Sequence, residues 1–98
     1  MIIQQADDKK RGLLFVEQDG ERLAEMVYKY SSPAVIIIEH TEVDDLLRGK
    51  NVGYQLVHRI VEFARAENLT IIPLCPFTKS VFDKDHSLSD VLFKFNQS

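Results

Sequence analysis

The sequence predicts an α/β (α+β) domain in which antiparallel hairpins lead into one βαβ crossover. Three observations support this prediction: strand-like runs separated by short turns, one clearly amphipathic helix, and a short apolar run directly after that helix. The chain has 98 residues, of which 45% are hydrophobic. This is enough for one core, so we expect a single domain over residues 1–98.

The first half of the chain predicts three strands joined by tight turns. Residues 13–17 form the first strand, and Asp19-Gly20 is a hairpin turn signal because glycine adopts a positive φ without steric cost. Residues 22–30 alternate between two faces, as a returning strand does. After a turn at 31–33, a β-branched run extends over 34–43. We expect its start to be buried on both faces and its polar end to open toward solvent or a ligand.

The second half predicts a helix, a strand and a second helix. Apolar residues at helical spacing indicate a helix that begins at Val52 and ends near Asn68, a residue suited to a left-handed cap. A short strand follows over residues 69–75. The second helix is predicted over residues 76–84, with Pro76 in its first turn.

The crossover brings three separate segments together. A loop and a helix join the strand ending at Val43 to the strand starting at Leu69, so we expect these strands to be parallel neighbours. In such units ligands bind beyond the carboxyl ends of the strands. Residues 40–43, residues 73–75 and the turn 48–53 all lie at that end.

Composition argues against several classes of protein. The formal net charge of −3 argues against a general nucleic-acid binder, and a single cysteine excludes an internal disulfide. The longest apolar run, residues 34–38, is too short to cross a bilayer. No secretory or transit segment opens the chain, so we expect a cytoplasmic protein without nucleic-acid or membrane partners, a monomer or weak homodimer.

The glycine-containing basic turn Arg48-Gly49-Lys50-Asn51-Val52-Gly53 directly opens the amphipathic helix. Free backbone N–H groups, the positive end of the helix dipole and two cationic side chains make it a suitable site for a phosphate or pyrophosphate. The alternative is an ordinary helix start with glycines for turning. The turn matches neither a P-loop nor the Gly-x-Gly-x-x-Gly dinucleotide turn.

The spacing Arg48-x-x-Asn51-x-Gly53 resembles the pyrophosphate-binding signature of the GNAT acetyltransferases, Gln/Arg-x-x-Gly-x-Gly/Ala. With His40-Thr41-Glu42-Val43 before it and Pro73-Leu74-Cys75-Pro76-Phe77 after it, the chain from about residue 13 to residue 92 resembles a short single-domain branch of that superfamily. The resemblance implies a GNAT-like mixed sheet whose two parallel strands splay around the pantetheine arm of acetyl-CoA. Pro73 suits either such a parting of strands or a plain sheet edge.

The resemblance also implies a cofactor, acetyl-CoA, and an acceptor of unknown identity that we expect to be an amine. Asn51 departs from the family motif, which has glycine there, but asparagine tolerates a left-handed backbone well. The residues expected to contact the cofactor follow from the matched segments: Thr41, Glu42, Val43, Arg48, Gly49, Lys50, Asn51, Val52, Gly53, Pro76 and Phe77.

Cys75 and His40 are the candidate catalytic pair. Each ends one of two adjacent strands, and His40 is predicted to share a face with Ile36 and Ile38. A Cys–His contact lowers the pKa of the thiol and yields a thiolate able to take an acetyl group from a thioester. The resemblance implies the same two residues. The alternatives are a buried cysteine that acts as a small apolar residue and a hydrogen-bonded histidine at a strand end.

Several functions stay open at this point. The leading one is acetyl transfer from acetyl-CoA to an amine, either directly or through S-acetyl-Cys75. The others are a CoA-binding or CoA-sensing module with little or no turnover and an interaction protein that keeps the fold without the ligand. No metal site is predicted, because neither the His40 and Glu42 pair nor the His58 and Glu62 pair has a third ligand at metal spacing.

Overall fold

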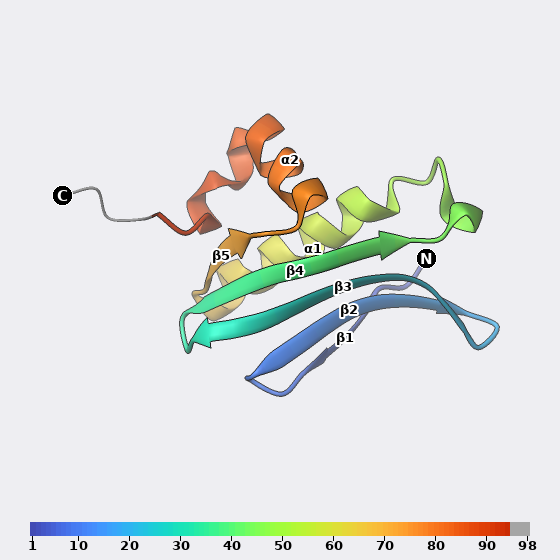
Figure 1. The fold of residues 1–98 in the computed structure, drawn as a ribbon, viewed down its shortest axis with the longest axis horizontal. Coiled ribbons are helices and arrows are strands. Elements are labelled where there is room, and N and C mark those ends of the chain that lie inside the picture. The colour runs from blue at the N-terminus through green and yellow to red at the C-terminus, as the bar shows by residue number, and fades with distance from the viewer. Residues whose placement is uncertain (95–98) are drawn as a thin grey trace.

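The computed structural model describes residues 1–94, which form a five-stranded mixed sheet with its helices packed on one face (Figure 1). The strands lie in the sheet in chain order; β1 to β4 are antiparallel, and β4 and β5 are parallel. This confirms the predicted α/β class and the parallel pairing across the crossover. The elements are β1 Gln4–Asp7, β2 Arg11–Gln18, β3 Glu21–Ser32, β4 Val35–Val43, a 3₁₀ turn Asp45–Leu47, α1 Val52–Glu67, β5 Thr70–Pro73, α2 Pro76–Lys84 and a 3₁₀ helix His86–Val91.

Three of the predicted local signals take the expected form. Asp19 and Gly20 connect β2 to β3, and both adopt a positive φ, of 51° and 80°. Asn68 ends α1 in the left-handed conformation with φ 56°, and Pro76 is the first residue of α2. None of the helices among residues 1–94 combines the length and the apolar character that crossing a bilayer requires.

β1 is a strand that the sequence analysis did not predict. Its residues show no apolar alternation, and the strand is held by the backbone ladder to β2 and by side-chain contacts from β3. The ring of Tyr28 passes over Gly12 of β2, where a Cβ would overlap it. The Tyr28 hydroxyl donates to Oδ2 of Asp7 at 2.6 Å, and the Tyr30 hydroxyl donates to the same oxygen at 2.8 Å.

β4 contains a β-bulge at Glu39. Two consecutive residues of β3, Val27 and Tyr28, pair with His40 and Ile38, so Glu39 is left without a partner in the register. Side chains alternate between the two faces of a strand, and one extra residue therefore reverses the faces of all residues after it.

The bulge decides which side His40 occupies. Thr41 pairs with the buried Met26 and faces the helices, as Ile38 does, whereas His40 lies on the other face of the sheet. The prediction that His40 shares a face with Ile36 and Ile38 is therefore wrong. We call the face that the helices leave uncovered the open face.

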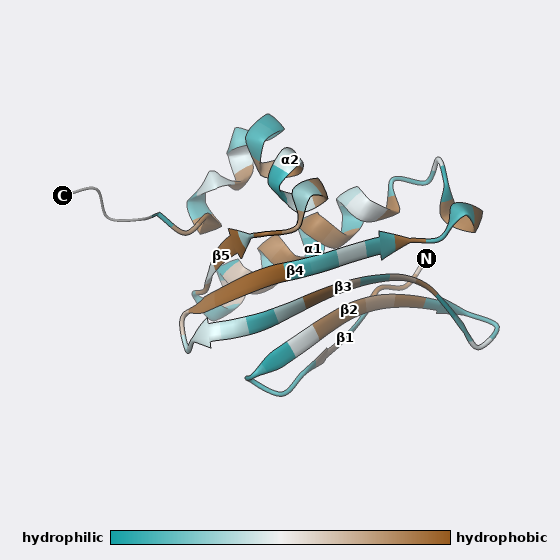
Figure 2. Cartoon of the chain, viewed as in Figure 1, coloured by the Kyte–Doolittle hydropathy of each residue, from teal (hydrophilic) through white to brown (hydrophobic). Residues whose placement is uncertain are grey.

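The start of β4 is also less buried than expected. Ile36 and Ile38 are fully buried, but Val35 and Ile37 are half-buried because the helices pack on one face only. The prediction of burial on both faces is wrong for this reason. The polar carboxyl end is exposed, as predicted, and the change from apolar to polar along β4 is visible in Figure 2.

β5 is shorter than its predicted range of 69–75. It ends at Pro73, and the N–H groups of Leu74 and Cys75 both donate to the carbonyl of Ile38 at 3.1 Å. The register with β5 stops at the Ile38–Pro73 pair, while β4 continues to Val43. Among the described residues, no strand therefore pairs with the last part of β4 on the β5 side, and the parallel strands part where the resemblance implies.

Candidate functional site

A pocket of about 440 Å³ opens where the end of β4 extends beyond β5. Eight of its ten lining residues were predicted as cofactor contacts, and the other two, Leu47 and Tyr54, were not. In the sequence, Leu47 is indistinguishable from an ordinary core residue, and Tyr54 is indistinguishable from a residue on a helix surface. Nothing in the sequence therefore identified them as pocket residues. The lining residues are Thr41, Val43, Leu47, Arg48, Gly49, Asn51, Val52, Gly53, Tyr54 and Phe77.

Three of the predicted cofactor contacts lie outside this lining. They are Glu42, Lys50 and Pro76. Glu42 belongs to the open face because of the β-bulge, and the carbonyl of Lys50 accepts a hydrogen bond from the Gln55 side chain at 2.9 Å, which holds the loop against α1.

The N-terminus of α1 faces the pocket without a side-chain cap. Asn51 precedes the helix in the left-handed conformation, with φ 54° and ψ 34°, and its side chain makes no cap hydrogen bond. The first bond of the helix runs from the Gln55 N–H to the Asn51 carbonyl. The N–H groups of the first turn therefore point toward the pocket without helical partners, and they carry the positive end of the helix dipole.

Arg48 is the cationic side chain of the pocket wall. Its guanidinium donates to Asp45 at 2.9 Å, and both side chains are largely exposed. An exposed pair of this kind holds the arginine weakly, so the guanidinium is free to exchange this partner for an anionic ligand.

Gly53 and Phe77 bring the two helices into contact at the pocket. A Cβ on residue 53 would lie 2.8 Å from Cζ of the Phe77 ring. A side chain at residue 53 would therefore have to displace the neighbouring Phe77 ring. Phe77 remains 41% exposed and forms an apolar wall of the pocket.

Cys75 immediately precedes α2 and is only 6% exposed. Burial raises the pKa of its thiol, but the hydroxyl of Thr41 and the amide and hydroxyl of Thr78 favour the thiolate, and the pKa lies below its ordinary value. The thiol makes no cap hydrogen bond of standard geometry. The Thr41 and Thr78 hydroxyls are 3.4 Å apart, which links β4 to α2 beside the sulfur.

His40 is not a partner of Cys75. Its Nε2 atom lies 3.2 Å from Oε2 of Glu42 and 3.9 Å from Oε2 of Glu25, all on the open face. The structure thus separates the two predicted catalytic residues onto opposite faces of the sheet. It also corrects the statement that His40 and Glu42 have no third neighbour of ligand type, because Glu25 on β3 brings a carboxylate oxygen to within 4.8 Å of both ligand atoms.

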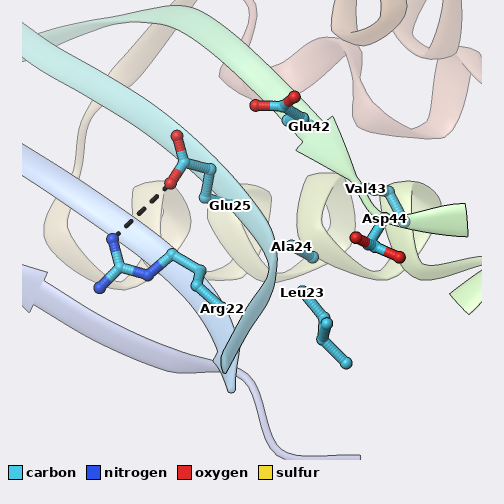
Figure 3. Close-up of a pocket in the computed structure, with 7 residues that line it drawn as sticks. All are labelled: Arg22, Leu23, Ala24, Glu25, Glu42, Val43 and Asp44. Atoms are coloured by element: carbon cyan, nitrogen blue, oxygen red, sulfur yellow. Dashed lines mark ion pairs between the residues drawn. The ribbon is translucent and has the colours of Figure 1, made fainter. Parts of the chain in front are cut away.

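A second pocket, of about 250 Å³, lies beside this cluster (Figure 3). Three carboxylates line it, from Glu25, Glu42 and Asp44, together with the guanidinium of Arg22, which lies 3.6 Å from Glu25. Val43 lines both this acidic pocket and the pocket at α1.

Comparisons with known proteins identify the same fold and one family. A family described as GCN5-related N-acetyl-transferase matches residues 13–91. The solution structure of a GCN5-like protein from Staphylococcus aureus is 33% identical, covers 98% of this chain and 91% of its own, and superposes with a TM-score of 0.73. No curated protein sequence matches the chain.

More distant structures share the fold. A ribosomal-protein-alanine N-acetyltransferase from Brucella melitensis is 14% identical, with a TM-score of 0.63 over 93% of this chain and 69% of its own. The structure of AAC(6')-Iy in complex with a CoA-containing bisubstrate analogue is 12% identical, with a TM-score of 0.54 over 91% of this chain and 66% of its own.

Proposed function

Because the chain belongs to the GCN5-related N-acetyltransferase family, we propose that it binds acetyl-CoA in the pocket at α1 and transfers the acetyl group to an amine. One observation carries this proposal: within the described residues, two segments whose backbone groups lack partners line the same pocket. One segment is the uncapped first turn of α1, and the other is the edge of β4 beyond Pro73.

The pyrophosphate of acetyl-CoA would lie on the turn 48–53. Uncapped N–H groups at a helix N-terminus bind phosphate oxygens well, because the donors and the dipole act together. Arg48 adds a cationic side chain that is held only by an exposed ion pair. The left-handed backbone at Asn51 supports the loop conformation that glycine provides in the family motif.

The pantetheine arm would run along the edge of β4 at Thr41 to Val43. Peptide-like amides of the arm resemble a strand, and an unpaired strand edge presents the donors and acceptors that such a ligand requires. Phe77 and Leu47 supply apolar parts of the pocket lining. In this position the thioester would lie near Thr41 and the neighbouring Cys75 thiol.

Two routes for the acetyl group follow from the surroundings of Cys75. In the first, the thiolate attacks the thioester carbonyl, the carbon–sulfur bond to CoA breaks, and an amine then takes the acetyl group from S-acetyl-Cys75. The hydroxyls of Thr41 and Thr78 support this route because they favour the thiolate. In the second, the amine attacks the thioester directly. The near-complete burial of Cys75 favours the second route.

A CoA-binding or CoA-sensing module with little or no turnover is a second candidate function. It is favoured by one feature of the fold: β1 is joined to β2 by a tight turn at 8–10, and the face of the sheet opposite α1 and α2 is bare among the described residues. An acceptor would therefore meet a shallow surface rather than an enclosed cavity.

Two measurements separate these functions. Isothermal titration with CoA and with acetyl-CoA tests whether the pocket binds the cofactor, and Gly53→Val serves as the blocked variant. Release of free CoA thiol during incubation with a panel of amines then tests turnover. Binding with turnover supports the acetyltransferase, binding without turnover supports the sensing module, and the absence of binding contradicts both.

A further inference from the structure

Tyr54 lines the pocket at α1, and the proposed positions of the pyrophosphate and the pantetheine arm give it no role. It is the third residue of α1, directly after Gly53, and it belongs to the turn that carries the N–H groups without helical partners. Tyr54 is 37% exposed. A large aromatic ring that stays at the surface beside a pocket is available to a ligand, whereas most such rings are buried in a core.

The Tyr54 ring is stacked on the imidazole of His58. The two ring centroids are 5.6 Å apart, and the ring planes are inclined by 27°. The residues are one helical turn apart, and because helical side chains lean toward the N-terminus, His58 lies over the turn that Tyr54 occupies. Contact with the imidazole covers one side of the Tyr54 ring and restricts its rotation, so a ligand meets a ring that is already oriented.

The chemistry of CoA brings one flat ring to this position. Its adenine is joined to the pyrophosphate through a single ribose, whereas the thioester lies at the far end of the pantetheine arm. With the pyrophosphate on the turn 48–53, the adenine stays near the start of α1, where Tyr54 lies. The other aromatic residue of the lining, Phe77, follows Cys75 closely at the start of α2, on the side of the pocket proposed for the pantetheine arm.

We infer that Tyr54, backed by His58, stacks against the adenine of CoA and makes this chain select cofactors that carry the adenosine half. This inference rests on the proposed cofactor pocket and adds a residue that decides cofactor specificity. Aromatic side chains stack on bases through dispersion and the burial of apolar ring faces, and such a contact does not depend on the acyl group. Tyr54 therefore contributes equally to the binding of CoA and of acetyl-CoA and takes no part in the chemistry at the thioester.

The test is an amide chemical-shift titration of the full chain with CoA and with each of its halves. The two halves are adenosine 3′,5′-bisphosphate, which lacks the pantetheine arm, and 4′-phosphopantetheine, which lacks the adenosine. Tyr54→Leu keeps an apolar side chain but removes the ring. It should weaken the binding of CoA and of the adenosine bisphosphate about tenfold, the scale of one base stacked on an aromatic ring, and leave 4′-phosphopantetheine binding unchanged.

Two further variants separate stacking from a structural role of residue 54. Tyr54→Phe keeps the ring and should bind all three probes as the native chain does. His58→Ala should cause a smaller loss than Tyr54→Leu, for CoA and the adenosine bisphosphate only, because the tyrosine ring is then free to turn. In the complex of the native chain with CoA, nuclear Overhauser contacts should join the adenine protons to the Tyr54 ring.

Glu62→Gln, an exposed change further along α1 and outside the pocket lining, is the matched control and should leave all three affinities unchanged. Equal losses of CoA and 4′-phosphopantetheine binding in Tyr54→Leu, an unchanged affinity of that variant for CoA, or an adenine without Overhauser contacts to Tyr54 would each overturn the inference. Failure of the proposed function looks different, because CoA and 4′-phosphopantetheine would then leave the amides of residues 41–54 of the native chain unshifted.

Discussion

Gly53 in the first turn of α1 lies directly against the ring of Phe77 in the first turn of α2, so close that a Cβ at residue 53 would stand 2.8 Å from the ring. This contact joins the two helices across the proposed cofactor pocket, and both residues line it. A side chain at residue 53 therefore has to displace a partly exposed aromatic ring, rather than a fixed backbone, before it affects any ligand.

The first prediction concerns this contact. Gly53→Ala should leave the free energy of unfolding within about 1 kcal/mol of the native value, because the Phe77 ring can rotate away. It should weaken CoA binding about tenfold, because the displaced ring enters the pocket, and isothermal titration measures that change. In a double-mutant cycle with Phe77→Ala, the two effects should not add, since the clash is gone once the ring is removed. If the effects of the two substitutions on CoA binding were strictly additive, residue 53 would act directly on the ligand and not through the Phe77 ring.

The second prediction concerns Asn51. Its backbone is left-handed, at φ 54°, and its side chain makes no cap hydrogen bond that would offset the cost of this conformation. Asn51→Gly should tighten CoA binding by up to about fivefold as that strain is relieved. Asn51→Ala should weaken it, because alanine tolerates this conformation less well than asparagine. If Asn51→Gly binds CoA more weakly than the native chain, the asparagine side chain contacts the ligand.

The third prediction concerns Cys75. Because Thr41 and Thr78 favour the thiolate, the rate of alkylation by iodoacetamide should reach half its plateau at a pH below 9.0, the ordinary thiol pKa, and Thr41→Val should raise that midpoint. His40→Ala should leave it unchanged, since His40 is on the other face. Acetyl-CoA should protect the thiol. A midpoint that moves with His40 but not with Thr41 would contradict the separation of these residues.

The covalent route has its own measurement. Incubation with acetyl-CoA should add one acetyl group to the intact protein, and Cys75→Ala should not acquire it. A native protein that turns over amines without ever acquiring the acetyl mass uses the direct route, and the thiol is then a structural residue beside the site.

The fourth prediction concerns Asp7 and acid stability. Burial raises the pKa of Asp7, but hydrogen bonds from the Tyr28 and Tyr30 hydroxyls lower it, and the pKa lies below its ordinary 3.8. A lowered pKa in the folded state means that the stabilisation is complete above 3.8 and is lost as the pH falls through the folded value. Urea unfolding should show this loss, of about 1 kcal/mol, in the native protein.

Asp7→Asn is the comparison for this measurement. It should be less stable than the native protein at neutral pH and should lose less stability on acidification, because no carboxylate remains to titrate. Equal acid sensitivity of the two proteins would contradict a lowered pKa of Asp7 in the folded state.

Local patterns in the sequence determined much of this protein. Alternation along residues 22–30 specifies a half-buried strand, and the Asp19-Gly20 pair specifies its turn, because each depends only on neighbouring residues and backbone sterics. The spacing Arg48-x-x-Asn51-x-Gly53 placed a turn at the start of α1, and the pocket forms there. The family, too, could be identified from these short segments.

The tertiary structure alone decided the features that depend on pairing between distant residues. β1 has no apolar alternation, and it is a strand because β2 offers an edge and Tyr28 reaches Asp7 across Gly12. Glu39 looks like any strand residue, yet the register with β3 makes it a bulge and turns His40 to the open face. Side chains along a strand alternate between the two faces of the sheet, so one unpaired residue moves every later side chain to the opposite face. That reversal separated His40 from Cys75 and placed it between Glu25 and Glu42.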